Sequence, residues 1–300
     1  MKDHISICIC TYRRNKMLER LLRKVALQDT GGLFDFSVVV VDNDATGPAK
    51  ETVLRLRDEL GLDITYGVEP EQRIPAARNH SVRLAKGNYI GIIDDDEFPP
   101  QNWLITMFRA IQTFDVDGAL GPVHPFFEQK PPAWLIKSGL CERPVHRTGT
   151  LLSWDQTRTG NVLLKKNVFK KNNLHFDVEL TTGEDRAFFK EAMRAGFRFT
   201  AVYEAPVYEI VPPGRWTKKY YLKRALIFGM NAHKYSARGM SGMSFIAVSA
   251  KSFGAVLGYA LSAPVCACVG SHVLINCLER GAHHLSRLFA MIGIELVQQP

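Results

Sequence analysis

Two periodicities of apolar residues alternate through the first half of the chain. Short apolar runs typical of β-strands occur at residues 4–10, 36–42, 63–67, 89–94 and 117–123. Between these runs, apolar residues recur at steps of three and four over residues 15–28, 47–60, 74–87 and 100–112. That spacing predicts amphipathic helices. Repeated strand–helix units favour right-handed crossovers, so we expect an α/β protein with a mainly parallel sheet flanked by helices.

The polar residues that follow the strands are expected to share one edge of this sheet. Parallel strands bind ligands in the crevice beyond their carboxyl ends. The predicted strands end near Cys10, Asp42, Gly67 and Asp94. The loops after these residues should therefore form a common cleft.

An abrupt change from apolar to acidic residues marks the fourth of these strand ends. The run Tyr89–Ile93 is followed by Asp94, Asp95, Asp96 and Glu97. Packed carboxylates raise one another's pKa unless a cation lies among them. Their oxygen atoms suit Mg²⁺ or Mn²⁺, which would bridge them to a phosphate. A second interpretation is that the acids cap the helix that begins near residue 100.

Composition and charge add a second region with a different character. The chain has 300 residues, of which 46% are hydrophobic and 23% are charged, as in ordinary globular proteins. Its net charge of +8 equals the number of basic residues between Glu209 and Glu279, where no acid occurs. Such a segment favours an anionic partner: nucleic acid, a phosphorylated ligand or an acidic membrane surface. No nucleic-acid-binding motif accompanies it, so we expect no nucleic acid partner.

The tail also contains an uncharged stretch, Ser252–Leu278, which exceeds the ~20 apolar residues that cross a bilayer. Pro264 near its middle predicts a break or kink in a helix. Three arrangements remain open: two short helices dipping into one leaflet, one straight crossing, or a soluble helical pair. We expect residues 213–300 to form a basic, apolar, helical, membrane-associated tail after a catalytic domain at 1–212. The N-terminus lacks a signal-peptide pattern.

Five motifs together resemble the family-2 glycosyltransferases, which have the GT-A nucleotide-sugar transferase fold with a Rossmann-like sheet. They are SICICTYRR (6–14), VVVVDND (38–44), IPAARN (74–79), GNYIGIIDDDE (87–97) and GEDRAFF (183–189). The order and spacing of these motifs match the family over residues 4–212. Within the family, the chain looks closest to bacterial exopolysaccharide glucosyltransferases of the succinoglycan type.

The resemblance implies a role for each matching residue around a nucleotide-sugar. The nucleotide-binding residues that it implies are Thr11, Tyr12, Arg13, Asp42, Arg78, Asn79, Asp94 and Asp95. Asp42 corresponds to the carboxylate that binds the uracil ring. Asp94 and Asp96 correspond to the D-x-D pair, with Asp94 toward the ribose and Asp96 toward the metal ion. Three consecutive aspartates leave this register open.

The resemblance also implies a catalytic base, Asp185, preceded by a substrate-contacting Glu184. An acceptor hydroxyl needs such a carboxylate within hydrogen-bond reach. Because aspartate at a helix start is also a common cap, a structural role for Asp185 stays open. The neighbouring Arg186 would either keep Asp185 ionised or lie on the helix surface. Arg215 in the segment GRW is interpreted as facing a phosphate.

These features predict an inverting glycosyltransferase that moves a hexose from a UDP-sugar to a polyprenyl-diphosphate-linked saccharide. The expected setting is surface or exopolysaccharide synthesis at the cytoplasmic face of the inner membrane, with Mg²⁺ or Mn²⁺ as cofactor. A nucleotidyltransferase acting on a sugar phosphate is one alternative, although TYRRNK (11–16) lacks the glycine-rich activation loop. A non-catalytic, membrane-tethered nucleotide-sugar binder is the other alternative.

Overall fold

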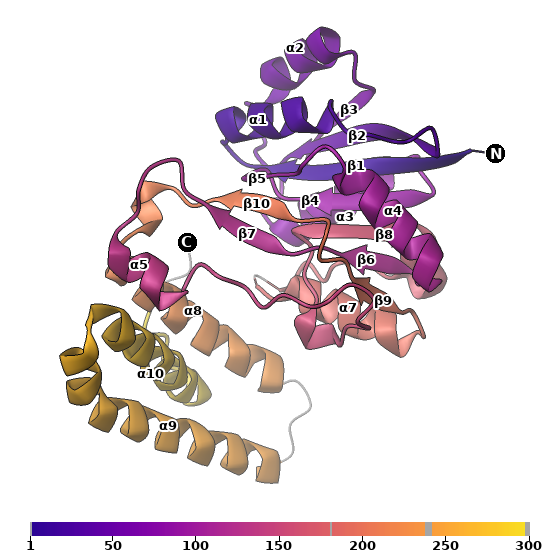
Figure 1. Cartoon of the computed structure of the whole chain (residues 1–300). Coiled ribbons are helices and arrows are strands. Elements are labelled where there is room, and N and C mark those ends of the chain that lie inside the picture. The colour runs from indigo at the N-terminus through magenta and orange to yellow at the C-terminus, as the bar shows by residue number, and fades with distance from the viewer. Residues whose placement is uncertain (1, 181, 238–241, 298–300) are drawn as a thin grey trace. The chain divides into compact units, whose positions relative to one another are not determined.

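The computed structural model describes residues 2–180, 182–237 and 242–297 (Figure 1). The chain forms two compact units. The first comprises residues 1–126 and 143–210, and the second comprises residues 127–142 and 211–300. The sequence placed a boundary at residue 212, whereas the structure also assigns residues 127–142 to the C-terminal unit. Arg238 of the basic tail segment lies outside the described residues.

The first unit contains a seven-stranded sheet in the order β3-β2-β1-β4-β8-β6-β9. Its strands are β1 (Asp3–Thr11), β2 (Phe34–Asp42), β3 (Ile64–Val68), β4 (Tyr89–Ile93), β6 (Gly118–Leu120), β8 (Asn161–Lys165) and β9 (Phe199–Ala201). The pairs formed by β1–β2, β2–β3, β1–β4 and β6–β9 are parallel. Only β8 runs against its neighbours, β4 and β6. The predicted mainly parallel sheet is therefore present.

Helices cover both faces of this sheet, and each face has its own apolar core. On one face α1 (Asn15–Val25), α2 (Lys50–Leu60) and α4 (Trp103–Phe114) pack on inward side chains such as Ile7 and Val40. On the other face α3 (Ile74–Leu84), α6 (Asn167–Lys170) and α7 (Glu184–Arg194) pack on side chains such as Val39 and Ile92. Burial of both alternating sets explains why β2 reads as a continuous apolar run.

A second, three-stranded sheet in the first unit consists of β5 (Glu97–Phe98), β10 (Val207–Ile210) and β7 (Val123–Phe126). It explains why the run expected at 117–123 splits into β6 and β7. Gly121 separates the two strands, and a Cβ atom there would lie 2.0 Å from the carbonyl oxygen of Ala205. Only glycine permits this close approach of two backbones.

The first unit also contains two short 3₁₀ helices, at Trp154–Gln156 (η1) and Lys171–Asn173 (η2).

The second unit is helical. It contains α5 (Ala133–Ser138), η3 (Pro213–Arg215), α8 (Lys218–Ala237), α9 (Gly242–Val269) and α10 (Ser271–Met291). Of the break or kink expected at Pro264, the break is wrong, because α9 continues through that residue to Val269. The chain turns at Gly270 instead, where φ is +150°, so the uncharged stretch is divided between two long helices. Proline removes one helical hydrogen bond, but glycine alone readily adopts the backbone conformation of this turn.

Candidate active site

Polar residues follow β1, β2 and β4 at the edge of the large sheet where these three parallel strands end. Thr11 is the last residue of β1 and pairs with Asp42, the last residue of β2. On the other side of β1, β4 ends at Ile93 and is followed directly by Asp94. The common carboxyl edge of these parallel strands therefore brings together three loops that are distant in sequence.

Asp42 is fully buried at this edge and retains one open oxygen. Its Oδ2 accepts hydrogen bonds from the backbone N–H of Ala49 at 2.7 Å and the hydroxyl of Tyr66 at 3.1 Å. Its Oδ1 has no hydrogen-bond partner among the residues that the structure describes. Buried polar atoms are normally satisfied, so Asp42 Oδ1 is suited to accept a hydrogen bond from a ligand N–H or O–H group.

Tyr12 and Arg13 form the exposed margin of the same edge. The Arg13 guanidinium lies 5.1 Å from the centre of the Tyr12 ring and donates to Asp44 Oδ2 at 2.6 Å. Hydrogen bonds from Thr46 and from Arg13 lower the pKa of Asp44 to about 2. The sequence analysis did not single out Asp44. An exposed aromatic ring beside a cation can contact a planar base or an anionic group.

The acidic block at the end of β4 divides into exposed and buried carboxylates. The Asp94 side chain is 43% exposed, whereas Asp95, Asp96 and Glu97 are buried. Thr11 Oγ1 donates to Asp95 Oδ2 at 2.7 Å and so holds the acidic loop, and its expected position along a nucleoside stays a prediction. Arg14 Nη1 donates to Asp95 Oδ1 at 2.9 Å and to Asp96 Oδ2 at 3.0 Å. Asp95 is thus engaged within the protein.

Arg14 is a site residue that the sequence analysis missed. The adjacent arginines of TYRRN are indistinguishable by residue type. In the structure Arg13 has a positive φ of 54° and pairs with Asp44, whereas Arg14 pairs with the acidic block. The left-handed backbone at Arg13 is uncommon for a non-glycine residue and has no signature in the sequence.

The negative charge of this block is only partly neutralised. Burial and the charge of Asp94 together raise the pKa of Asp96 to about 6, against the opposing effect of Arg14. Burial and the charge of Asp94 also raise the pKa of Glu97 well above its ordinary value. A cation added beside these groups would stabilise their ionised forms.

The two carboxylates of Asp94 and Asp96 fit a divalent cation that is completed by its substrate. Among the described residues, no group of three or more His, Cys, Asp or Glu side chains is arranged to hold a metal ion by itself. Mg²⁺ is usually bound through one or two carboxylates together with water and substrate phosphates. The chemistry of this pair, next to under-neutralised acids, fits that kind of site.

Arg78 connects the acidic block to the start of α7. Its side chain is buried; Nη1 donates to Glu184 Oε1 at 2.6 Å, and Nη2 lies 3.4 Å from Asp94 Oδ1. The structure thereby brings the IPAARN and GEDRAFF segments to the same point. Glu184, expected to contact substrate, is buried and engaged in this ion pair. The expected contact of Glu184 with substrate stays a prediction.

Asn79 contacts the backbone ahead of α7, and its expected contact with the nucleotide stays a prediction. Its Nδ2 donates to the carbonyl oxygen of Phe176 at 2.7 Å, and its Oδ1 accepts from the backbone N–H of Phe176 at 2.9 Å. Both ends of the amide therefore bind the backbone of the segment ahead of α7. In sequence, an asparagine that binds backbone looks the same as one that binds a ligand.

Asp185 lies in the first turn of α7, beside Glu184, and is partly exposed. The preceding Gly183 has a φ of +75°, a conformation that suits glycine at this turn. Asp185 Oδ1 accepts the backbone N–H of Arg186 at 2.7 Å. Asp185 is thus positioned near Arg78 and can act as a proton acceptor.

The remaining predicted site residue, Arg215, belongs to η3 of the second unit. Its proposed contact with a phosphate stays a prediction.

Comparison with known proteins identifies the family. The glycosyl transferase family 2 profile matches residues 6–194. The chain is 30% identical to the succinoglycan biosynthesis protein ExoM of Rhizobium meliloti, over 99% of this chain and 95% of that protein. It is also 26% identical to chondroitin synthase of Escherichia coli, over 71% of this chain and 35% of the synthase.

Solved structures share the fold at low sequence identity. A mannosyltransferase from Pyrobaculum calidifontis, solved with GDP-mannose and Mn²⁺, matches with a TM-score of 0.63 and 16% identity. The match covers 96% of this chain and 88% of that one. Staphylococcus aureus TarS 1–349, solved with UDP, matches with a TM-score of 0.55 and 16% identity over 97% and 92% of the two chains. The expected GT-A-type α/β fold with a C-terminal apolar helix is confirmed.

Proposed function

We propose that this chain, which belongs to glycosyl transferase family 2, transfers a hexose from a UDP-sugar to a lipid-linked saccharide with inversion at the anomeric carbon. The observation that carries the proposal is the bridge formed by Arg78. It joins Asp94 of the acidic block to Glu184, which immediately precedes Asp185. A site for a departing diphosphate and a proton acceptor would thus share one buried guanidinium.

The open oxygen of Asp42 supports a uridine donor. A uracil ring has an N–H group that Asp42 Oδ1 could accept, which would satisfy this buried atom. The exposed ring of Tyr12 would lie along the base. UDP is also the ligand in the solved TarS complex, and the fold likeness is consistent with a nucleotide at this edge.

The acidic block would bind the diphosphate together with a cation. Asp94 and Asp96 would hold Mg²⁺ or Mn²⁺, which supplies neutralisation of the negative charge that develops on the leaving UDP. Arg14 keeps Asp95 and Asp96 in place through its two hydrogen bonds. Arg78 contacts Asp94, the remaining aspartate of the block, and would orient its carboxylate. Prearranged charges of this kind stabilise a transition state without reorganising during the reaction.

Asp185 would accept the proton of the acceptor hydroxyl as that oxygen attacks the anomeric carbon. Attack on the face opposite to the leaving UDP gives a single displacement, so the product has the inverted configuration. Glu184 keeps Arg78 in its bridging position, which couples the location of the base to that of the donor site.

The first test is UDP release from a panel of UDP-sugars. We expect one or a few UDP-hexoses to be turned over with Mn²⁺ or Mg²⁺, and EDTA to suppress the release. GDP-mannose serves as the matched control, because its base presents different hydrogen-bonding groups to Asp42. If the protein instead turns over a nucleoside triphosphate with a sugar phosphate, and no nucleotide-sugar, the proposal is contradicted and a nucleotidyltransferase is indicated.

The second unit offers a surface suited to the membrane that carries such an acceptor. Residues Phe245–Val269 of α9 are long and apolar enough to cross a bilayer, with a mean hydropathy of 1.7. Besides Phe245, six large apolar side chains are exposed on α9 at intervals of four or seven residues: Ile246, Phe253, Leu257, Leu261, Val265 and Val269. This spacing puts them along one side of the helix. An exposed apolar stripe of this length is typical of an interaction surface.

The packing of α10 against α9 favours a position along the membrane surface over a crossing. Cys277 Sγ donates to the carbonyl oxygen of Tyr259 at 3.2 Å, and His284 lies 3.4 Å from Ser252 Oγ, so the helices are antiparallel neighbours. A crossing by α9 would take the charged residues of α10, among them Glu279 and Arg280, into the bilayer. Charges at that depth are costly. An in-plane pair avoids this cost, with basic residues of α8 available to anionic headgroups.

Replacement of two exposed leucines tests this surface. We expect the Leu257→Glu/Leu261→Glu protein to bind phosphatidylglycerol vesicles at least about tenfold more weakly than wild type, because each leucine contributes on the order of 1.5–3 kcal/mol when buried. Flotation at low and high salt measures the binding, and high salt should release little wild-type protein. Leu33→Glu, a similarly exposed position in the first unit, is the control. Equal flotation of both variants would contradict a role for the α9 stripe.

A further inference from the structure

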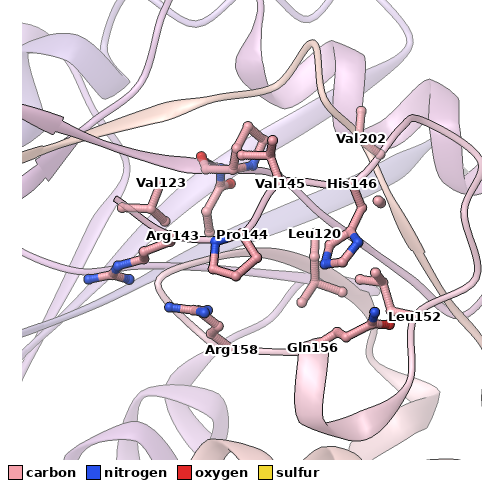
Figure 2. Close-up of a pocket in the computed structure, with 14 residues that line it drawn as sticks. Leu120, Val123, Arg143, Pro144, Val145, His146, Leu152, Gln156, Arg158 and Val202 are labelled. Carbon is pink, nitrogen blue, oxygen red and sulfur yellow. Dashed lines mark hydrogen bonds between the residues drawn. The ribbon is translucent and has the colours of Figure 1, made fainter. Parts of the chain in front are cut away.

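A cavity lies in the first unit (Figure 2). Its volume is about 40 Å³, compared with the roughly 10–15 Å³ that one water molecule needs. Leu120, Leu152 and Val202 form apolar parts of its wall, and Arg143 and Arg158 contribute guanidinium groups. Figure 2 shows these two guanidinium groups on the same side of the lining. The cavity can therefore take a small polar group next to concentrated positive charge.

Arg158 is the unusual member of this lining. It is partly buried, and it forms no hydrogen bond or ion pair with any other residue in the described part of the chain. Arg143, by contrast, is paired with Glu209. Withdrawing a charge from water without a partner is unfavourable. A partly buried guanidinium with no internal partner is therefore suited to an anion supplied from outside the protein.

Two further guanidinium groups are among the charges that act most strongly on Arg158. Burial lowers the pKa of Arg158, and the nearby positive charges of Arg143 and Arg186 lower it further, whereas Asp185 and Glu209 act in the opposite sense. Three guanidinium groups thus act against two carboxylates, one of which already pairs with Arg143. An arginine stays protonated in such surroundings, so the excess positive charge persists.

The position of the cavity relates it to the acceptor side of the site. In the sheet order β2-β1-β4-β8-β6-β9, Asp42 ends β2, whereas Leu120 and Ala201 of the cavity end β6 and β9. The acidic block after β4 lies between these two ends. Arg158 is two residues from Gly160, where a Cβ atom would lie 2.7 Å from Glu97 Oε1 and 3.2 Å from Asp94 Oδ2. A short segment therefore leads directly from the acidic block to the cavity.

We propose that Arg158, together with Arg143, binds an anionic group carried by the acceptor, a phosphate or a carboxylate located close to the hydroxyl that receives the sugar. Arginine binds both groups through two parallel N–H···O hydrogen bonds. The anion would come either from the diphosphate of a lipid carrier or from an acidic sugar residue. The inference rests on the proposed function, because it assigns the donor nucleotide to the Asp42 end and the acceptor to the Asp185 end.

The test uses the full-length protein saturated with UDP, so that the donor site is filled. Glucose 1-phosphate and methyl β-glucuronide probe the phosphate and the carboxylate, and methyl β-glucoside is the neutral probe; calorimetry measures binding. We expect one of the charged probes to bind roughly 10- to 100-fold more tightly than the neutral one, because hydrogen bonds to charged groups increase affinity by about this factor. The preferred probe distinguishes a lipid diphosphate from an acidic sugar.

Three variants test whether Arg158 causes the preference for a charged probe over the neutral probe. Arg158→Gln should abolish the preference for the charged probe, and Arg158→Lys should restore part of it, while UDP affinity stays unchanged in both. Arg147→Gln is the control, because Arg147 is exposed in the same segment and does not line the cavity. Equal binding of charged and neutral probes by wild type, or a preference that survives in Arg158→Gln, would overturn the inference. If the wild-type protein does not bind UDP, the proposed function is overturned instead. Binding of the charged and neutral probes is then compared in the absence of nucleotide, and this comparison still tests the anion subsite.

Discussion

Replacement of Asp185 by asparagine is expected to lower the rate of sugar transfer by roughly 10²–10⁴-fold, the contribution of a positioned general base. Asparagine has nearly the same shape, and its amide oxygen can still accept the backbone N–H of Arg186 that Asp185 Oδ1 accepts. The turn at the start of α7 and the Arg78–Glu184 ion pair should therefore persist. Single-turnover transfer rates, together with UDP affinity from calorimetry, measure the two effects separately.

The control for this variant is Asp155→Asn, which removes an exposed carboxylate whose charge acts on the same neighbour, Arg186. Its transfer rate should stay close to that of wild type. Loss of UDP binding by Asp185→Asn with unimpaired residual chemistry would identify Asp185 as a helix cap. The anomeric configuration of the product, read by NMR, tests the mechanism itself. Retention of the donor's configuration would exclude the single displacement.

Replacement of Asp96 by asparagine is expected to lower metal-stimulated turnover by at least about 100-fold, comparable with the loss of one strong transition-state contact. The carboxylate is one of the two that fit a divalent cation, and its neutral amide would no longer attract one. Turnover measured against Mn²⁺ concentration provides the readout. Turnover that still depends on the metal with an unchanged midpoint would show that the cation is held elsewhere.

The same variant has a defined effect on stability against pH. Folding raises the pKa of Asp96 from 3.8 to about 6. A carboxyl group that binds its proton more tightly when folded favours the native state at low pH, and this contribution is lost as pH rises from about 4 to above 6. Asp96→Asn removes that loss. The melting temperature of the variant at pH 7.5 should therefore equal or exceed that of wild type, and the difference should shrink toward pH 5.

Glu97→Gln is the matched control for both measurements. Glu97 is fully buried, and burial together with Asp94 raises its pKa well above the ordinary value, so its neutral form is already favoured. Glutamine imitates that form. Metal-stimulated turnover should consequently be little changed. A larger loss of metal-stimulated turnover in Glu97→Gln than in Asp96→Asn would indicate that Glu97, and not Asp96, binds the cation.

Local patterns predicted the elements that carry the site. The run 36–42 became β2 (Phe34–Asp42), and the helix expected at 74–87 became α3 (Ile74–Leu84). The predictions differ from the structure at the ends of elements and at Pro264. Helix α9 passes through Pro264 without a break, and the chain turns at Gly270. A helix can lose one hydrogen bond to proline while its neighbours keep theirs. Element ends therefore depend on competing interactions that a short window does not contain.

The sequence by itself determined that Asp42 and the acidic block meet at one sheet edge, because apolar periodicity predicts parallel strands and such strands end together. Tertiary structure alone decided which side chains are engaged there. Arg14 and not Arg13 holds the acids, and Asn79 binds the backbone of Phe176, 97 residues away. The same is true of the cavity that contains Arg158. These pairings join segments whose proximity arises only when helices and strands pack, and residue type does not reveal whether a polar side chain then faces protein or ligand.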